Sequence, residues 1–179
     1  MNLTSPIAET AGDWQARVRG LPAEVRTRLA ARARTAPLFA HAYAFHLNFR
    51  FGGMVPAGLL DWAAARGLPG VKIHVEDGEG HSLNAMSPDQ LAAFAARARD
   101  LGLEVHVETS STEARELAAT VAISHAVGAT SMRCYPRYEG RVSEIIARTI
   151  ADLRGLAALD PHGRLTFTLE QHEDLTSDE

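Results

Sequence analysis

The feature that most restricts the fold of this chain is a regular alternation of β-rich runs and helical patterns from about Ala40 onward. The β-rich runs are AHAYAFHLNF, GVKIHVED, LEVHVETS, TSMRCYPR and RLTFTLEQHED, residues 40–49, 70–77, 103–110, 130–137 and 164–174. Amphipathic helical patterns lie between them, over residues 54–68, 87–103, 112–129 and 141–160. A strand followed by a helix, repeated along the chain, predicts a parallel sheet with helical crossovers.

Residues at the predicted helix ends agree with this assignment. Ser87 and Pro88 suit the N-cap and the first turn of the second crossover helix. Gly67, Gly102 and Gly128 each stand where a helix should end, because glycine adopts the left-handed conformation of a helix C-terminus easily. These capping residues and glycines therefore support helices between the β-rich runs.

Four of the runs place apolar and polar residues alternately, and successive side chains of a strand point to opposite faces. The apolar positions are Val71, Ile73, Val75, Leu103, Val105, Val107, Met132, Cys134, Leu165, Phe167 and Leu169. The opposite positions are polar and largely ionisable: Lys72, His74, Glu76, Glu104, His106, Glu108, Ser131, Arg133, Tyr135, Thr166, Thr168, Glu170 and His172. Each strand thus has one apolar and one polar face.

This pattern restricts the architecture further. A doubly wound sheet is covered by helices on both faces, so its central strands are almost wholly apolar. A barrel of parallel strands fits better, with the apolar face against outer helices and the polar face lining the interior and the C-terminal mouth. Unpaired charges in such an interior would cost several kcal/mol each, so we expect the lining to bind a metal, a polar substrate or both.

The stretch FTLEQHEDLTSDE resembles the fifth strand of the xylose isomerase-like barrels, the sugar phosphate isomerase/epimerase superfamily. GVKIHVEDG, LGLEVHVETSS and ATSMRCYPR resemble its strands two, three and four. The resemblance implies an α/β fold, a (β/α)8 TIM barrel, of which this chain holds about the first five strands. We expect an N-terminal helical extension over residues 1–38 and a partial barrel over residues 39–179.

The resemblance also implies a divalent metal ion (Mn²⁺, Mg²⁺, Co²⁺ or Zn²⁺) held at the C-terminal mouth by Glu, Asp, His and Glu from strands five to eight. Glu170 matches the first of these ligands, and the other three would lie beyond Glu179. We therefore expect the chain to associate, either as a homo-oligomer or with the missing half of the barrel, because a partial barrel leaves unpaired strand edges.

Seven residues are candidates for the site. Glu170, Glu108 and His106 are expected to be catalytic, and His46, His74, Arg133 and His172 to bind substrate, with Glu170 also a metal ligand. Structural alternatives stay open: Glu170 could cap a helix, Arg133 could form an internal ion pair with Glu108 or Glu104, and His172 could be a surface residue. Some of His74, His106 and Glu108 are expected to be structural members of an internal network. Cys134 is expected in the core and not as a nucleophile.

The resemblance implies a metal-dependent isomerase or epimerase acting on a sugar, sugar phosphate or sugar acid through an enediolate. Two alternatives stay open. One is a lyase or decarboxylase acting on an oxo-sugar acid in the same barrel, because fold does not fix the reaction. The other is a catalytically incomplete fragment that serves as a binding or assembly module.

Composition limits the partners and the location. The net charge of -4 argues against a nucleic-acid partner, although residues 13–34 are arginine-rich and could form a basic patch. We favour a solvated helix face there, with Leu21, Val25 and Leu29 packed inward. No run is long and apolar enough for a membrane, no signal peptide is visible, and the single cysteine excludes an internal disulfide, so a cytoplasmic protein is expected.

Overall fold

The computed structural model describes residues 11–76 and 82–170, and the chain divides into two compact units after Pro37. The first unit contains α1 (Ala11–Gly20) and α2 (Ala23–Thr35). No residue of α2 is buried, and Leu29 is 46% exposed. The predicted helices are present, but the inward packing expected of Leu29 is wrong, because nearly half of its surface is exposed in the described structure.

The second unit, from Leu38 onward, carries the alternating strands and helices. Its five strands are β1 (Ala40–His41), β2 (Gly70–His74), β3 (Glu104–Glu108), β4 (Ser131–Cys134) and β5 (Thr166–Leu169). Its helices are α3 (His46–Arg50), α4 (Pro56–Ala64), α5 (Pro88–Asp100), α6 (Ala114–Val127), α7 (Val142–Leu153) and α8 (Leu156–Leu159), with 3-10 turns η1 (Ala42–Phe45) and η2 (Leu83–Ala85). None of the helices in the described residues is both long and apolar enough to cross a membrane.

The strands form one parallel sheet in the order β1-β2-β3-β4-β5. Each strand therefore pairs with the next one along the chain, and the order never reverses. A doubly wound sheet reverses its order at a switch point, whereas a TIM barrel adds strands in sequence. The topology confirms the predicted fold class: α/β, with the first part of a barrel.

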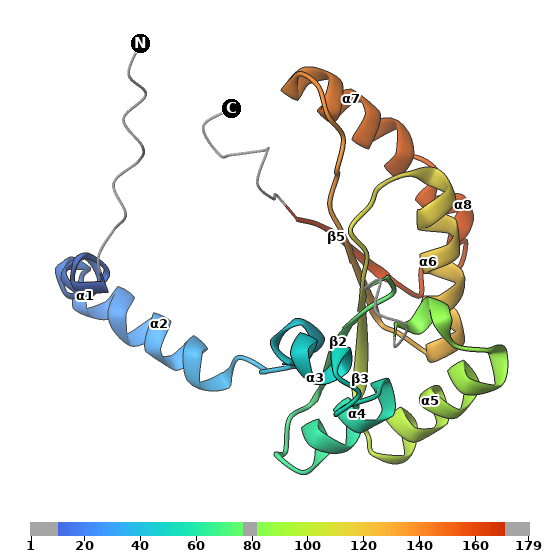
Figure 1. Cartoon of the computed structure of the whole chain (residues 1–179). Helices are drawn as coiled ribbons and strands as arrows, with labels where there is room; N and C mark the ends of the chain where they lie inside the picture. The colour runs from blue at the N-terminus through green and yellow to red at the C-terminus, as the bar shows by residue number, and fades with distance from the viewer. Residues whose placement is uncertain (1–10, 77–81, 171–179) are drawn as a thin grey trace. The chain divides into compact units, whose positions relative to one another are not determined.

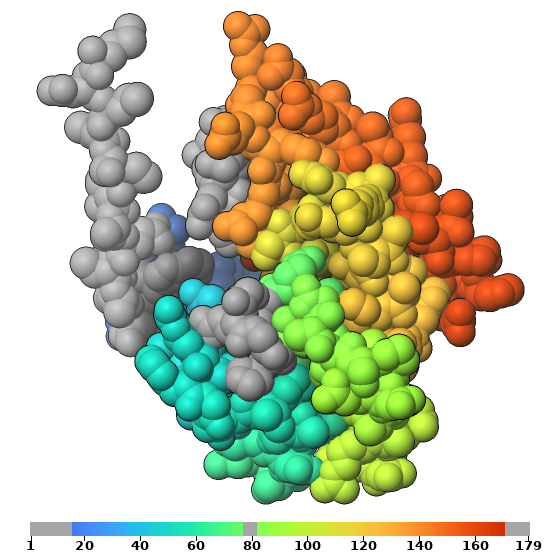
Figure 2. Space-filling view, turned by 45° about the vertical axis from the view of Figure 1, so that its right-hand side comes forward, coloured from blue at the N-terminus to red at the C-terminus, as the bar shows by residue number. Residues whose placement is uncertain are grey.

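Within the described part of the second unit, α4, α5 and α6 pack against one face of the sheet (Figure 1). Helix α4 contacts β2, α5 contacts β3, and α6 contacts β3 and β4. The apolar strand residues under these helices include Val71, Val105, Val107 and Met132, all nearly inaccessible to solvent. Seen from their outer side, α5 to α8 form a continuous surface running from green to orange (Figure 2). Burial of the apolar face stabilises the sheet and leaves the polar face for the site.

The expected helix boundaries are present. Ser87 is the N-cap of α5, where its hydroxyl accepts from the Gln90 N–H and the Gln90 side chain accepts from the Ser87 N–H. The three glycines at the helix ends have φ angles of 66°, 65° and 69°, in the left-handed region that favours glycine: Gly67, Gly102 and Gly128. These local signals fix where each crossover starts and stops.

The first predicted strand is much shorter than expected. Residues 40–49 were predicted as one β-rich run, but only Ala40 and His41 are in the sheet. His41 is the N-cap of η1, and its Nδ1 accepts a hydrogen bond from the Tyr43 N–H at 3.1 Å. The chain then turns into η1 and α3, so His46 lies in the first turn of a helix and not at the end of a strand.

Candidate functional site

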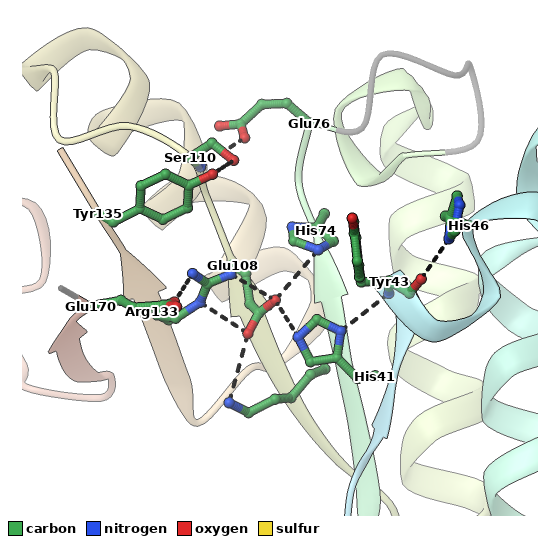
Figure 3. A network of polar contacts seen from close by, with 11 residues as sticks. His41, Tyr43, His46, His74, Glu76, Glu108, Ser110, Arg133, Tyr135 and Glu170 are labelled. Atoms are coloured by element: carbon green, nitrogen blue, oxygen red, sulfur yellow. Dashed lines mark hydrogen bonds and ion pairs between the residues drawn. The ribbon is translucent and has the colours of Figure 1, made fainter. Parts of the chain in front are cut away.

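A cleft of about 920 Å³ opens at the carboxyl ends of the strands. It is lined by residues that lie in or follow the five strands: His41, Ala42, Tyr43, His46, Phe49, Lys72, Ile73, His74, Glu76, Glu108, Ser110, Arg133, Tyr135, Arg137, Thr168, Leu169 and Glu170. Most of these side chains are polar, and the close-up shows many of them converging from β1 to β5 (Figure 3). Carboxyl ends of parallel strands are where TIM barrels place their chemistry.

Glu108 is the central acid of the cleft, and its side chain is only 1% exposed. Its carboxylate lies 2.9 Å from His41 Nε2, 3.5 Å from His74 Nε2 and 3.6 Å from Lys72 Nζ. Burial alone would raise the pKa of this carboxyl. Hydrogen bonds and charges from His41 and Arg133 outweigh burial and lower the pKa to about 2. Glu108 is therefore a permanent anion near neutral pH, which makes it a poor general base.

Arg133 connects two carboxylates through one planar guanidinium. Its Nε donates to Glu108 Oε1 at 3.0 Å, and its Nη2 lies 3.0 Å from Glu108 Oε2. Its Nη1 donates to Glu170 Oε2 on the other side (Figure 3). Burial lowers the pKa of Arg133, but bonding to the two carboxylates has the larger combined effect and raises it. Arg133 thus fixes the position of Glu170 relative to Glu108.

His41 belongs to the site although the sequence did not indicate it as a candidate. Because Nδ1 accepts from the Tyr43 N–H, the proton of the neutral ring lies on Nε2 and points at Glu108. The signal that identifies His41 is strand register, because this residue pairs with Lys72, which is on the polar face.

The ring nitrogens of His41 and His74 and a carboxylate oxygen of Glu108 all lie within 4.8 Å of one another, so this group could hold a metal ion. Two imidazoles and one carboxylate are a common ligand set for transition metals. An ion at His41 Nε2 would move the ring proton to Nδ1, which now accepts from the Tyr43 N–H. Metal binding at this group therefore requires that hydrogen bond to break.

The rim of the cleft is built from the ends of β2, β3 and β4. Glu76 accepts hydrogen bonds from the Thr109 hydroxyl and, at 3.3 Å, from the Ser110 N–H. The Tyr135 hydroxyl donates to Ser110 Oγ at 2.9 Å. Arg137 lies over the Tyr135 ring, with its guanidinium carbon 5.9 Å from the ring centroid. The rim therefore combines an acid, hydroxyl groups and an arginine, which suits a polyhydroxylated ligand.

The structure brings together most of the residues chosen from the sequence. His46, His74, Glu108, Arg133 and Glu170 line the cleft. In the case of Arg133, the alternative of an internal ion pair with Glu108 is also present.

One chosen residue among those described, His106, does not line the cleft. His106 is on the polar face but not in the cleft lining; its ring stacks on Phe39 at 4.3 Å, and its Nε2 lies 3.4 Å from Glu104. His106 is on the same face of β3 as Glu108 but two residues closer to the amino end of the strand. His172 lies outside the described residues.

No family model matches the sequence. The chain is 47% identical over 148 residues to the uncharacterized protein YihM of Escherichia coli (strain K12), a match that covers 83% of this chain and 45% of that protein. The chain thus spans about half the length of this curated relative.

Two solved structures have a similar fold. A crystal structure of D-psicose 3-epimerase in the presence of D-fructose aligns with 62% of this chain and 45% of its own, with a TM-score of 0.52 and 11% identity. A xylose isomerase domain protein from Planctomyces limnophilus aligns with 63% of this chain and 48% of its own, with a TM-score of 0.48 and 12% identity. At this identity the epimerase likeness shows the fold.

Proposed function

Because the fold of this chain is that of part of a xylose isomerase-like TIM barrel, we propose that it belongs to a sugar isomerase or epimerase that depends on a divalent metal ion. The observation that carries the proposal is the pair of carboxylates joined by Arg133 at the carboxyl ends of β3, β4 and β5. One of the two similar solved structures is a sugar epimerase, and the cleft is lined by groups that bind hydroxyls.

The two carboxylates have different roles in this proposal. Glu170 is less buried, with 39% of its side chain exposed, and it faces the cleft, so it is the residue that moves a proton at the carbon next to the substrate carbonyl. Glu108 is nearly inaccessible and stays ionised, so it positions Arg133, which in turn orients Glu170. His46 and His74 contact substrate hydroxyls from the other side of the cleft.

His46 is prepared for that contact by its own hydrogen bond. Its Nδ1 donates to the Tyr43 carbonyl at 2.9 Å, which leaves Nε2 of the neutral ring as an acceptor for a substrate hydroxyl. The ring also stacks on Tyr43 at 5.2 Å, and the apolar faces of aromatic rings pack well against the C–H faces of a sugar.

A divalent ion bound in the cleft would polarise the carbonyl and hydroxyl oxygens of the substrate. Glu170 fits the role of one ligand, because its carboxylate is half-buried and faces the cleft, and hard divalent ions prefer carboxylate oxygen. Arg133 competes with the ion for this carboxylate. The group of His41, His74 and Glu108 is a second place where an ion could bind.

The activity test is hydrogen exchange. The purified chain and the full-length Escherichia coli relative are incubated in D₂O with Mn²⁺ and D-psicose or D-fructose, and proton NMR follows loss of the proton next to the carbonyl. We expect exchange and formation of the epimer, reduced at least about 100-fold by Glu170→Gln. The control is Glu104→Gln, an exposed carboxylate on the same sheet face that does not line the cleft.

Three results distinguish the possibilities. No exchange in either protein with any ketose refutes the proposed reaction. Sugar binding by the chain without exchange, together with exchange by the longer relative, assigns to this chain a binding role within an enzyme. Equal loss of exchange in Glu104→Gln and Glu170→Gln refutes the role given to Glu170.

Metal dependence is tested by calorimetric titration of the chain with Mn²⁺ and Zn²⁺. Loss of binding in Glu170→Gln places the ion at Glu170, and loss in His74→Ala places it at the group of His41, His74 and Glu108. His125→Ala is the matched control, because this histidine pairs with Asp160 at 3.1 Å and does not line the cleft. Absence of binding in the unmodified chain would refute metal dependence for this chain.

A further inference from the structure

The cleft lining contains three basic side chains, and two of them already have carboxylate partners. Arg133 holds Glu108 and Glu170, and Lys72 Nζ lies 3.6 Å from Glu108 Oε1. The third is Arg137. Across the described ranges, 11–76 and 82–170, its contact is the face of the Tyr135 ring, and it forms no ion pair or hydrogen bond with another residue.

Tyr135 places this arginine close to the proposed reaction centre. The guanidinium carbons of Arg133 and Arg137 lie 5.3 Å and 5.9 Å from the centroid of the same Tyr135 ring. The ring is itself anchored, because the Tyr135 hydroxyl donates to Ser110 Oγ. Since Ser110 follows β3 and also donates its N–H to Glu76, the arrangement is fixed to the end of the sheet.

The two arginines therefore differ in what they can still bind. A guanidinium recognises phosphate or carboxylate through two parallel N–H donors. The Nε, Nη1 and Nη2 of Arg133 all face Glu108 or Glu170, so an anion could reach this group only by displacing a buried or half-buried carboxylate. Arg137 is exposed at the rim and offers its donors to a ligand without breaking an ion pair.

We infer that Arg137 binds a terminal anionic group, a phosphate ester or a carboxylate, on the sugar that occupies the cleft. The inference rests on the proposed function for the position of the sugar, whose carbonyl end lies at Glu170. The anionic end then lies on the far side of Tyr135. This assigns the substrate to the sugar phosphates or sugar acids and separates it from the neutral ketoses.

The test measures binding without turnover. Isothermal titration calorimetry compares D-fructose, D-fructose 6-phosphate and D-fructuronate, three ketoses that differ in the group at carbon six. We expect at least one anionic sugar to bind the unmodified chain at least tenfold more tightly than D-fructose. In Arg137→Gln, the affinity for the anionic sugar divided by the affinity for D-fructose should fall to about one. Arg115→Gln should keep the ratio of the unmodified chain, because Arg115 is an exposed arginine of α6 outside the cleft.

Comparison of the affinities for D-fructose 6-phosphate and D-fructuronate identifies which anion the site prefers. The inference is overturned if neither anionic sugar binds more tightly than D-fructose, if no sugar binds, or if Arg115→Gln loses the preference as completely as Arg137→Gln. Its failure is distinguishable from failure of the proposed function: exchange of D-fructose in D₂O without any preference for anionic sugars refutes only the role of Arg137. Preference for an anionic sugar, with no exchange in either the chain or the longer relative, supports Arg137 and refutes the proposed reaction.

Discussion

Glu108 of β3 and Arg133 of β4 are neighbours across the two strands, and their side chains form a bidentate ion pair. The two residues are register partners in the sheet, and two nitrogens of the guanidinium lie 3.0 Å from the two carboxylate oxygens. Both side chains leave the polar face of the sheet, so strand pairing itself sets their distance. Sheet register therefore determines the geometry of the proposed site.

Removing the charge of Glu108 should destabilise the fold. Glu108→Gln leaves Arg133 without the partner that compensates its burial, and breaking a buried pair costs about 3 kcal/mol or more. Urea unfolding at pH 7 measures the loss. Glu104→Gln is the control, because its 58% exposed side chain predicts a change below about 1 kcal/mol. Equal effects of the two substitutions would contradict the assignment.

Stability should also depend on pH through the same carboxyl. The pKa of Glu108 is about 2 in the folded protein against an ordinary value of 4.5, so its ionised form stabilises the fold fully above about pH 4.5. This contribution should be lost as the pH falls from 4.5 towards 2. Urea unfolding in the presence of EDTA, repeated across that range, should show a steeper decline for the unmodified chain than for Glu108→Gln. Parallel curves would refute the lowered pKa.

Cys134 should react slowly in the folded protein. Burial raises the pKa of its thiol to about 11, although the positive charge of Arg133 opposes this, and the residue is 1% exposed. Against an ordinary value of 9.0, this shift lowers the thiolate fraction at pH 8 by about 100-fold. Alkylation by iodoacetamide should therefore be slow in buffer and fast in 6 M guanidinium chloride. Since the chain has one cysteine, mass spectrometry reads out the site directly.

Gly70 should not tolerate a side chain. A Cβ at this position would overlap the Glu104 carbonyl oxygen and the Phe39 ring, and the carbonyl belongs to the sheet backbone. Gly70→Ala should cost about 1–3 kcal/mol in thermal or urea unfolding. Gly58→Ala is the matched control, because a Cβ there meets Met54 at an ordinary 3.6 Å within α4, where alanine favours helix. A neutral Gly70→Ala would show that β2 and β3 can move apart.

The chain should associate through its outer strands. In the described sheet, β1 and β5 each pair on one side, and Leu169 of β5 is 51% exposed. Unpaired edges with apolar residues attract further strands. Light scattering at rising concentration should give a mass above 19.3 kDa, and Leu169→Lys should lower it. Unmodified protein that stays at the mass of one chain at all concentrations would contradict this prediction.

The fold could be predicted from the sequence because two independent patterns agreed. The polar and apolar alternation in VKIHVE and LEVHVE identified the sheet faces, and the cap at Ser87 with the glycine at Gly102 located a crossover helix. These are local signals, fixed by side-chain direction and backbone conformation. They assigned Glu108, Arg133 and Glu170 to one face.

The rest of the site depends on contacts that are not local. The run after Ala40 has strand-like composition, but the hydrogen bond from the Tyr43 N–H to His41 turns it into η1. The alternation of side chains shows which face a residue is on but not how far along the strand it lies. His106 and Glu108 therefore looked equivalent, although of the two only Glu108 lines the cleft. The ion pairing that separates Arg133 from Arg137 becomes visible only when the strands are side by side.

The short first strand has a consequence for how this scaffold can diversify. One wall of the cleft, with Tyr43, His46 and Phe49, is formed by the short helical turns η1 and α3, which follow a two-residue strand. Insertions or substitutions in such a segment need not disturb the hydrogen-bond ladder of the sheet. Homologous proteins should therefore differ in ligand preference chiefly through this wall, while the opposite wall, anchored in three consecutive strands, keeps a constant charge arrangement.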